Sequence, residues 1–219
     1  MFCPIADLKR TVAAAAATLC ASALLPGCGT VVTSTQTDAF NEGFRGFDYC
    51  DVKAVVREDP QQSGSAALSC VATYWDRDAS PEYLFNRHPP ESREGYSIQQ
   101  LRRMAIGEGL IAFALSMNDQ PLEQLRSHIQ KGRPVIVSAQ LPGGRYFKRP
   151  LPILESIETD LMPGNPEDQT SRRFVVVAGE DSDELLLMDP AFGLVRVSKS
   201  AFLAWWGEEQ YSALLCSSR

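Results

Sequence analysis

The sequence predicts an α+β fold, in which an N-terminal helical half packs on a mostly antiparallel sheet. The first observation behind this prediction is a series of helix-like apolar spacings over 65–131. The second is a late cluster of short, branched apolar runs over 135–215, separated by turn residues. Helices that precede the strands, instead of alternating with them, are typical of α+β domains. No internal repeat is visible, so we expect one such domain.

The expected helices follow from their apolar spacing and their end signals. A helix is predicted over 65–75 because four apolar side chains would share one face, those of Ala67, Cys70, Val71 and Tyr74. Ser97 is a suitable N-cap for a helix over 98–108, and Gly132 would end another over 122–131. A last helix is expected over 199–206.

The expected strands are short runs of branched and apolar residues between turn signals. One follows the helix that Ser97 caps, and the others cluster in the C-terminal half, where they would form the sheet. They are predicted over 110–115, 135–137, 174–179, 185–189, 194–197 and 211–215.

The chain begins with the features of a secretory signal peptide. Two basic residues precede an apolar run over 12–25, which is too short to span a bilayer. The run ends in Leu-Pro-Gly-Cys, which resembles the signal of bacterial lipoproteins. The resemblance implies that residues 1–27 are removed and that Cys28 is lipidated, whereas an ordinary cleaved signal is the alternative. Because Gly29 follows, it also implies anchorage to the periplasmic face of the outer membrane.

Length and charge limit what the rest of the chain can be. Without the signal about 190 residues remain, which suffices for one domain and hardly for two. We expect a tether over 28–51, rich in small polar residues, and a domain over 52–219. The formal net charge of −6 argues against nucleic acid as a partner.

Cysteines and histidines have no spacing typical of a metal site, so we expect neither a metal nor another cofactor. His88 and His128 lie far apart, without cysteine or carboxylate partners at ligand spacing. Beyond the lipidated position, the mature chain keeps Cys50, Cys70 and Cys216 in an oxidising compartment. At most one disulfide can form among these three, and the sequence leaves open which pair it would join.

A series of motifs runs along the domain in a fixed order. They are Gly64 with Ala66-Ala67-Leu68, then Gly95-Tyr96-Ser97, Arg133-Pro134-Val135, Arg173-Phe174-Val175-Val176 and Asp189-Pro190. In this order and spacing they resemble cysteine peptidase family 39, the papain-like double-glycine peptidases that process bacteriocin leaders. The resemblance covers about 52–216 and implies a papain-like peptidase fold.

The resemblance also points to four positions of peptidase chemistry, and this chain departs from the family at three of them. Ser63 stands where the nucleophilic cysteine belongs, Arg173 at the histidine and Arg57 at the oxyanion glutamine, while Asp189 is kept. A glutamine at 61 or 62 is another candidate for the oxyanion role. A thiol peptidase needs a thiolate and a base, and a guanidinium cannot accept a proton. The residues therefore predict a degenerate member without catalytic residues.

Two interpretations of the replaced residues stay open. In the first, Arg173 and Asp189 face each other across adjacent strands as a structural ion pair. In the second, they join Arg57, Ser63 and the backbone N–H groups around Gly64 in a donor-rich corner that binds an anion, such as a peptide C-terminus.

The connection over about 140–172 is longer than the resemblance requires, and long loops often carry function. It holds Tyr146 and Phe147 between basic residues, which makes both candidates for ligand contact in a lid or docking surface. A tolerated surface insertion is the alternative.

Taken together, the sequence predicts a lipid-anchored envelope protein whose non-catalytic, peptidase-like domain binds a peptide or protein segment in export or surface assembly. Non-catalytic domains of the family, appended to exporters, are understood to bind substrate, and this is the basis for the analogy. Two alternatives stay open: an active cysteine-peptidase-like hydrolase that uses an unrecognised arrangement, and a passive scaffold in an envelope complex.

Overall fold

The structure is a computed structural model that describes residues 46–57, 59–144, 146 and 170–218. All of these residues fall within one compact unit, Ser34–Arg219. The predicted signal peptide over 1–27 and the lipidated Cys28 lie outside the described residues. None of the helices in the described ranges is long and apolar enough to cross a membrane.

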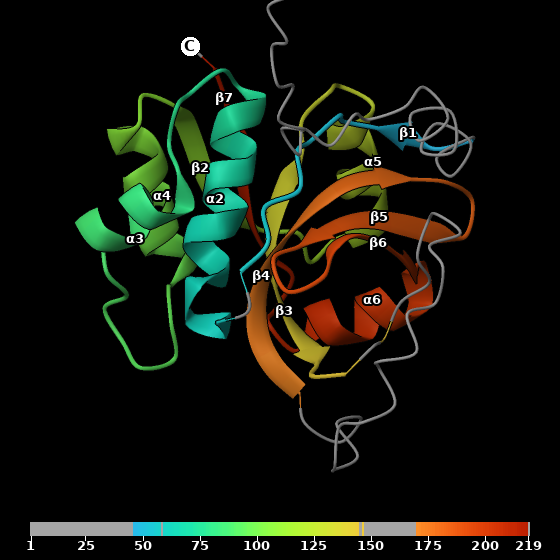
Figure 1. The fold of residues 1–219 in the computed structure, drawn as a ribbon. Coiled ribbons are helices and arrows are strands. Elements are labelled where there is room, and N and C mark those ends of the chain that lie inside the picture. Colours follow the sequence, from blue (N-terminus) through green and yellow to red (C-terminus); the bar gives the residue numbers. More distant parts are fainter. Residues whose placement is uncertain (1–45, 58, 145, 147–169, 219) are drawn as a thin grey trace, which may run out of the picture. The chain divides into compact units, whose positions relative to one another are not determined.

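The described strands form one antiparallel sheet, as predicted (Figure 1). Its order is β2-β7-β3-β4-β5-β6, with β1 added beside β4. The strands are β1 (Asp48–Tyr49), β2 (Ile111–Ser116), β3 (Val135–Pro142), β4 (Thr170–Glu180), β5 (Glu184–Asp189), β6 (Gly193–Ser198) and β7 (Ser212–Ser217).

Most helices precede the sheet's central strands, which confirms the α+β fold class. They are the 3-10 turn η1 (Pro60–Gln62), then α2 (Ser63–Tyr74), α3 (Pro81–Arg87), α4 (Ile98–Gly107), α5 (Pro121–Ile129) and α6 (Lys199–Gly207). Serine caps set several of these starts. The Ser97 side chain accepts from the Gln100 backbone N–H at α4, as predicted, and Ser80 caps α3 in the same way. Helix α3 was not predicted, because seven residues are too few to show a clear apolar period, although Ser80 and Pro81 are typical of a helix start.

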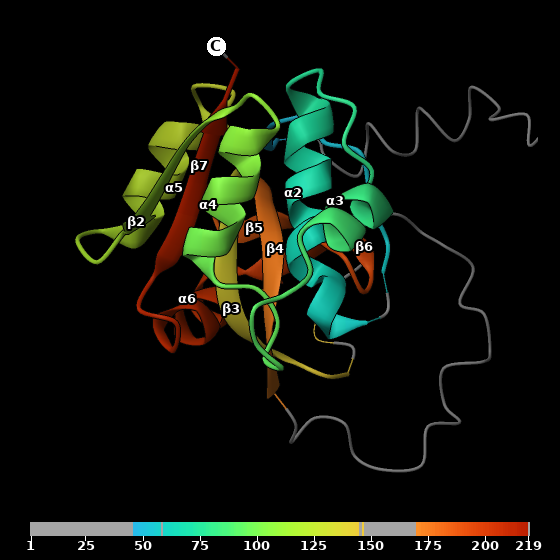
Figure 2. The same ribbon diagram turned by 90° about the vertical axis from the view of Figure 1, so that its left-hand side faces the viewer.

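Helices cover both faces of the sheet (Figure 2). Helix α2 packs against β3, β4 and β5, and α4 packs against β2 and β7. Helix α5 lies against β3 and β4, and α6 against β3 and β6, on the other side of the sheet in Figure 2. This arrangement places the start of α2 beside the start of β4, where the motif residues converge.

Helix α2 departs from the predicted one-sided helix. It begins two residues earlier than expected, at Ser63, and every residue from Ser63 to Ala72 is buried. The helix lies between the sheet on one side and α3 and α4 on the other. Its serine, glycine and alanine side chains are small enough to let these neighbours approach closely. A helix buried on all sides has no polar face, so the amphipathic pattern described only part of its surroundings.

The folded body begins before the predicted tether ends at residue 51. Phe47 and Cys50 are buried, and β1 pairs Asp48 with Glu180 of β4. The reason lies in β4, which continues past the point where β3 begins and takes β1 as its next partner. The predicted insertion over 140–172 is also shorter, because β3 extends to Pro142 and β4 starts at Thr170.

Candidate functional site

Ser63 is held at the junction of α2 and β4. The turn η1 leads directly into α2, and Asp59 caps that turn by accepting from the Gln61 backbone N–H. Ser63 is therefore the first residue of α2, with 3% of its surface exposed. Its hydroxyl oxygen accepts a hydrogen bond of 3.2 Å from the backbone N–H of Phe174. The hydroxyl thus joins the start of α2 to β4.

Arg173 and Asp189 face each other across β4 and β5, which confirms the predicted pairing. Arg173 Nη2 lies 3.8 Å from Asp189 Oδ2, and the two side chains are 5% and 0% exposed. This distance is too long for a hydrogen bond, so the attraction is coulombic. The hydrogen bonds are made elsewhere: Arg173 Nη2 donates to the Pro142 carbonyl at 2.7 Å, and Asp189 Oδ1 accepts from the Ala191 N–H at 2.8 Å.

Tyr146, a candidate for ligand contact in the sequence, belongs to this cluster. Its hydroxyl donates to Asp189 Oδ2, and its ring lies 5.2 Å from Trp205 and 5.9 Å from Phe192, centroid to centroid. The Arg173 guanidinium sits 5.6 Å from the same ring centroid. Burial, followed by the charge of Asp189, raises the pKa of Tyr146. The sequence could not show the contact between Tyr146 and Asp189, and Phe147 lies outside the described residues.

Arg57 is not part of this cluster, contrary to the predicted anion-binding corner. Its backbone N–H donates to the Pro190 carbonyl at 2.6 Å, which places its main chain next to the end of β5. Its guanidinium, however, contacts Glu82 of α3 and donates to the Val56 carbonyl at 2.7 Å. The positive charge is therefore already compensated by a carboxylate.

Gly64 has a packing role at the start of α2. A Cβ atom at this position would lie 2.7 Å from Cδ2 of Tyr96 and 2.9 Å from its Cγ. Tyr96 is itself 1% exposed, and its hydroxyl donates to the His88 carbonyl at 2.8 Å. The ring therefore cannot easily move away, and only glycine fits.

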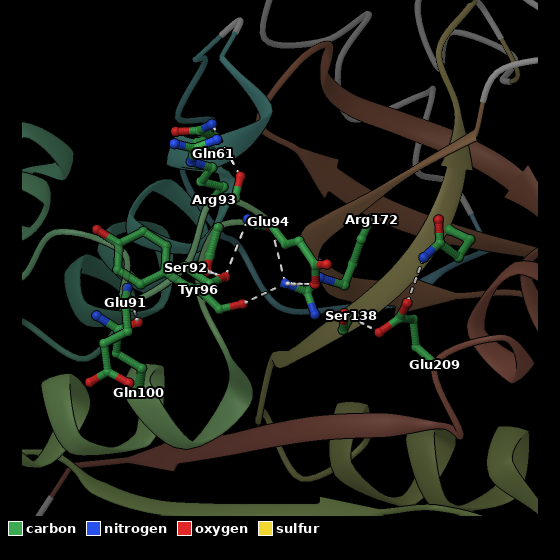
Figure 3. A network of polar contacts seen from close by, with 12 residues as sticks. Gln61, Glu91, Ser92, Arg93, Glu94, Tyr96, Gln100, Ser138, Arg172 and Glu209 are labelled. Carbon is green, nitrogen blue, oxygen red and sulfur yellow. Dashed lines mark hydrogen bonds and ion pairs between the residues drawn. The ribbon is translucent and has the colours of Figure 1, made fainter.

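A polar pocket of about 440 Å³ lies between η1, the loop before Tyr96, the ends of β3 and β4, and the turn after α6. Its lining includes Gln61, Arg93, Glu94, Gln140, Arg172 and Glu209. Apart from Gln61, the sequence singled out none of these six. Figure 3 labels five of them, all except Gln140, and shows Arg172 between the Glu94 loop and the Glu209 turn.

Arg172 and Arg173 are neighbours with different surroundings, because successive side chains of a strand point to opposite faces. Arg172 Nη2 donates to the carbonyls of Glu94 and Tyr96, at 3.0 and 3.3 Å, and lines the pocket. Arg173 points to Asp189, and both of these side chains are buried. Strand β4 thus separates an open polar pocket from a closed ion pair.

The three cysteines of the described residues are buried and free. Burial raises the pKa of Cys50 to about 11 and the pKa values of Cys70 and Cys216 to about 12, so none is a ready nucleophile at neutral pH. Burial, followed by the charges of Arg133 and Lys131, lowers the pKa of His128. Among the described residues, no group of three or more His, Cys, Asp or Glu side chains could hold a metal ion.

Comparisons with known proteins identify the fold. No protein-family model matches the chain, and no curated protein matches it. Among solved structures, it is similar to the peptidase domain of Streptococcus ComA, a bi-functional ABC transporter of a quorum-sensing pathway. The TM-score is 0.53 at 19% identity, covering 76% of this chain and 98% of that one.

Two further structures agree. One is a double-glycine motif protease from an AMS/PCAT transporter, in complex with its leader peptide, with a TM-score of 0.52, 18% identity and coverage of 78% and 94%. The other is a C39-like peptidase from Bacillus anthracis, with a TM-score of 0.55, 14% identity and coverage of 77% and 98%. The described domain therefore has the papain-like fold of the C39 leader peptidases, which its sequence motifs resemble.

Proposed function

We propose that this chain is a lipid-anchored envelope protein whose peptidase-like domain binds a peptide or protein segment without cleaving it. The observation that carries the proposal is the contrast across β4. On one face, buried Arg173 forms an ion pair with buried Asp189, which also accepts a hydrogen bond from Tyr146. On the other, Arg172 lines an open pocket with hydrogen-bonding groups on several sides.

The absence of cleavage is inferred from what surrounds Ser63. A serine nucleophile needs a neighbouring base, and the residue at the base position, Arg173, has no lone pair to offer. The Ser63 oxygen accepts from a backbone N–H and is nearly inaccessible. Asp189, which would orient a histidine in a peptidase, accepts from the Tyr146 hydroxyl instead. These contacts support a structural role for residues at the catalytic positions.

Peptide binding is supported by the pocket and by one of the similar structures. The pocket offers side-chain amides, carboxylates and guanidinium groups, which suit the alternating donors and acceptors of an extended peptide. The AMS/PCAT protease of the same fold was solved in complex with a leader peptide. We carry over from it only that this fold can hold a peptide.

The test is a binding assay with fluorescein-labelled degenerate hexapeptides and the full chain. We expect saturable fluorescence anisotropy without cleavage products in mass spectra. Arg172→Leu should weaken binding at least several-fold, because it removes a charged wall of the pocket. Arg103→Leu is the matched control, since this arginine is 57% exposed and pairs with Glu91 outside the pocket lining.

Two other outcomes would replace the proposal. Cleavage by the wild type that disappears in Ser63→Ala would establish a hydrolase with an unrecognised base. An absence of both binding and cleavage would leave the passive scaffold as the function.

The envelope location has its own test. An alkyne fatty acid supplied to the expressing cells should label the chain, and Cys28→Ser should abolish this label. We expect the wild type in the outer-membrane fraction, as the signal's resemblance implies. A labelled Cys28→Ser variant, or an unlabelled wild type, would refute the anchor.

A further inference from the structure

Glu209 is a charged residue of the pocket whose two carboxylate oxygens are both held by hydrogen bonds. One of its carboxylate oxygens, Oε1, accepts from Gln140 Nε2 at 2.7 Å, and the other, Oε2, accepts from Ser138 Oγ at 3.1 Å. Both donors come from the same face of β3, because residues two apart on a strand share a face. Figure 3 shows the Glu209 side chain directed at Ser138. The carboxylate is therefore fixed in one place by two neutral groups.

The strand order creates the space for this carboxylate. Strand β7 pairs with β3 only from Val135 to Val137, and its register ends there. Glu209 lies in the turn that leads from α6 into β7, next to the part of β3 that β7 leaves unpaired. The side chain thus takes its place beside Ser138 and Gln140 of β3.

The turn that carries Glu209 is strained. Gln210 and Tyr211 both have a φ of 53°, the left-handed region that non-glycine residues rarely adopt. A residue in this conformation persists only where its surroundings enforce it. Here Ser116 Oγ donates to the Gln210 carbonyl, and the Met117 N–H donates to the Tyr211 carbonyl at 3.1 Å. Strain of this kind is concentrated at binding sites.

The charge of Glu209 has no counter-charge within the described part of the chain. Its two contacts are an amide and a hydroxyl, and the ion pairs between described residues do not include it. Arg172, the cross-strand neighbour of Gln140, is directed to the carbonyls of Glu94 and Tyr96. The pocket therefore holds a fixed carboxylate that no cation of the described residues pairs with, and a guanidinium that is directed to backbone carbonyls.

From this arrangement we infer that the pocket selects a basic side chain: Glu209 pairs with a lysine or arginine of the bound segment, and Arg172 faces acceptor groups of the same segment. This inference rests on the proposed peptide-binding function and adds its specificity. A charge-assisted hydrogen bond contributes about 1.5–3 kcal/mol, which corresponds to roughly 10- to 100-fold in affinity.

The first experiment compares labelled hexapeptide pools that are degenerate except for one fixed position, occupied by lysine, arginine, norleucine or glutamate. For the full wild-type chain, we expect the lysine and arginine pools to bind at least 10-fold more tightly than the norleucine pool. In Glu209→Gln this ratio should fall to about one, while the norleucine pool keeps its affinity. Glu209→Asp, which retains the charge, should restore part of the preference.

Glu208→Gln is the matched control, because Glu208 belongs to the same turn but does not line the pocket. It should keep the full preference for basic pools. Equal binding of the lysine and norleucine pools by the wild type would overturn the inference and leave the proposed function standing. A preference that survives in Glu209→Gln would overturn it as well.

A second measurement separates the inference from the proposed function. The Gln140 side-chain amide is followed by NMR during titration with Nα-acetyl-lysine methylamide, with the norleucine analogue as the neutral probe. We expect shifts with the lysine compound alone, and none in Glu209→Gln. If the lysine compound causes these shifts but no peptide pool binds, the peptide-binding function is refuted and the cation site is retained. Equal shifts with both compounds, or no shifts, would refute the cation site.

Discussion

The buried pair of Arg173 and Asp189 gives the sharpest prediction for stability. Replacing Arg173 by methionine removes the guanidinium and leaves the Asp189 carboxylate in the interior. The two charges lie 3.8 Å apart. At an effective dielectric constant of about 20, their attraction is about 4 kcal/mol. Both side chains are almost fully buried, so little of this attraction is screened by solvent.

The Asp189 carboxylate would keep part of its support after the substitution, because Tyr146 and the Ala191 N–H still donate to it. We therefore expect Arg173→Met to lower the free energy of unfolding by about 3–4 kcal/mol, within the range for breaking a buried pair. The double variant Arg173→Met/Asp189→Asn removes both charges and should lose no more than about 2 kcal/mol.

The assay is urea unfolding of the full chain, followed by tryptophan fluorescence, since Trp205 contacts the cluster through Tyr146. Arg103→Met is the control: its ion pair with Glu91 is exposed, and its loss should change stability by less than about 1 kcal/mol. The reasoning is refuted if Arg173→Met costs as little as the control. It is also refuted if the stability losses of Arg173→Met and Asp189→Asn, measured singly, simply add in the double variant.

Three other predictions concern packing and titration. Gly64→Ala should lower the free energy of unfolding in urea by about 1–3 kcal/mol, because the methyl group would overlap the Tyr96 ring. Gly107→Ala is the control and should be neutral or stabilising, because its methyl group meets nothing within 4 Å. Equal effects of the two substitutions would contradict the packing. Burial raises the pKa of the thiols of Cys50, Cys70 and Cys216, so at pH 8 a thiol reagent should modify them only after denaturation, as mass mapping would show. For the same reason the stability of the fold should fall as the pH rises above about 9. Rapid labelling of the native protein would contradict this prediction. The lowered pKa of His128 means that the folded state binds this proton more weakly than the unfolded state does, so the stability of the fold should decline as the pH falls through about 6.5. His128→Gln should flatten this dependence of stability on pH. An unchanged dependence in the variant would show that His128 is not its cause.

Most of the fold could be predicted from the sequence because its elements carry local signals. Ser97 marks the start of α4 through a cap that depends only on neighbouring backbone, and the structure confirms it. The buried strands have branched side chains on both faces, which distinguishes them from their surroundings. The two-residue β1 has no such signal, because its existence depends on the free end of β4, far away in sequence. Local patterns cannot show a partner of that kind.

The sequence predicted the part of the candidate site that lies in the ordered motifs, namely Arg173 and Asp189. It did not predict Glu209, which lies in a turn. Arg173 and Asp189 occupy ends of adjacent strands, so their pairing followed from the resemblance and is confirmed. Glu209 could not be found in this way, because a turn with two left-handed residues that are neither glycine nor asparagine has no sequence signature. Its two hydrogen-bond partners on β3 become neighbours only in the folded chain.

The division of β4 into two faces has an evolutionary consequence. A change at Arg173 must be matched by changes at Asp189 and Tyr146, because these three side chains share one enclosed space. Arg172 is 27% exposed and directs its guanidinium to the carbonyls of Glu94 and Tyr96 instead, so it can mutate without such compensation. Related chains should therefore covary at the three enclosed positions while position 172 drifts with the ligand, which would let one scaffold acquire new specificities without losing its stability.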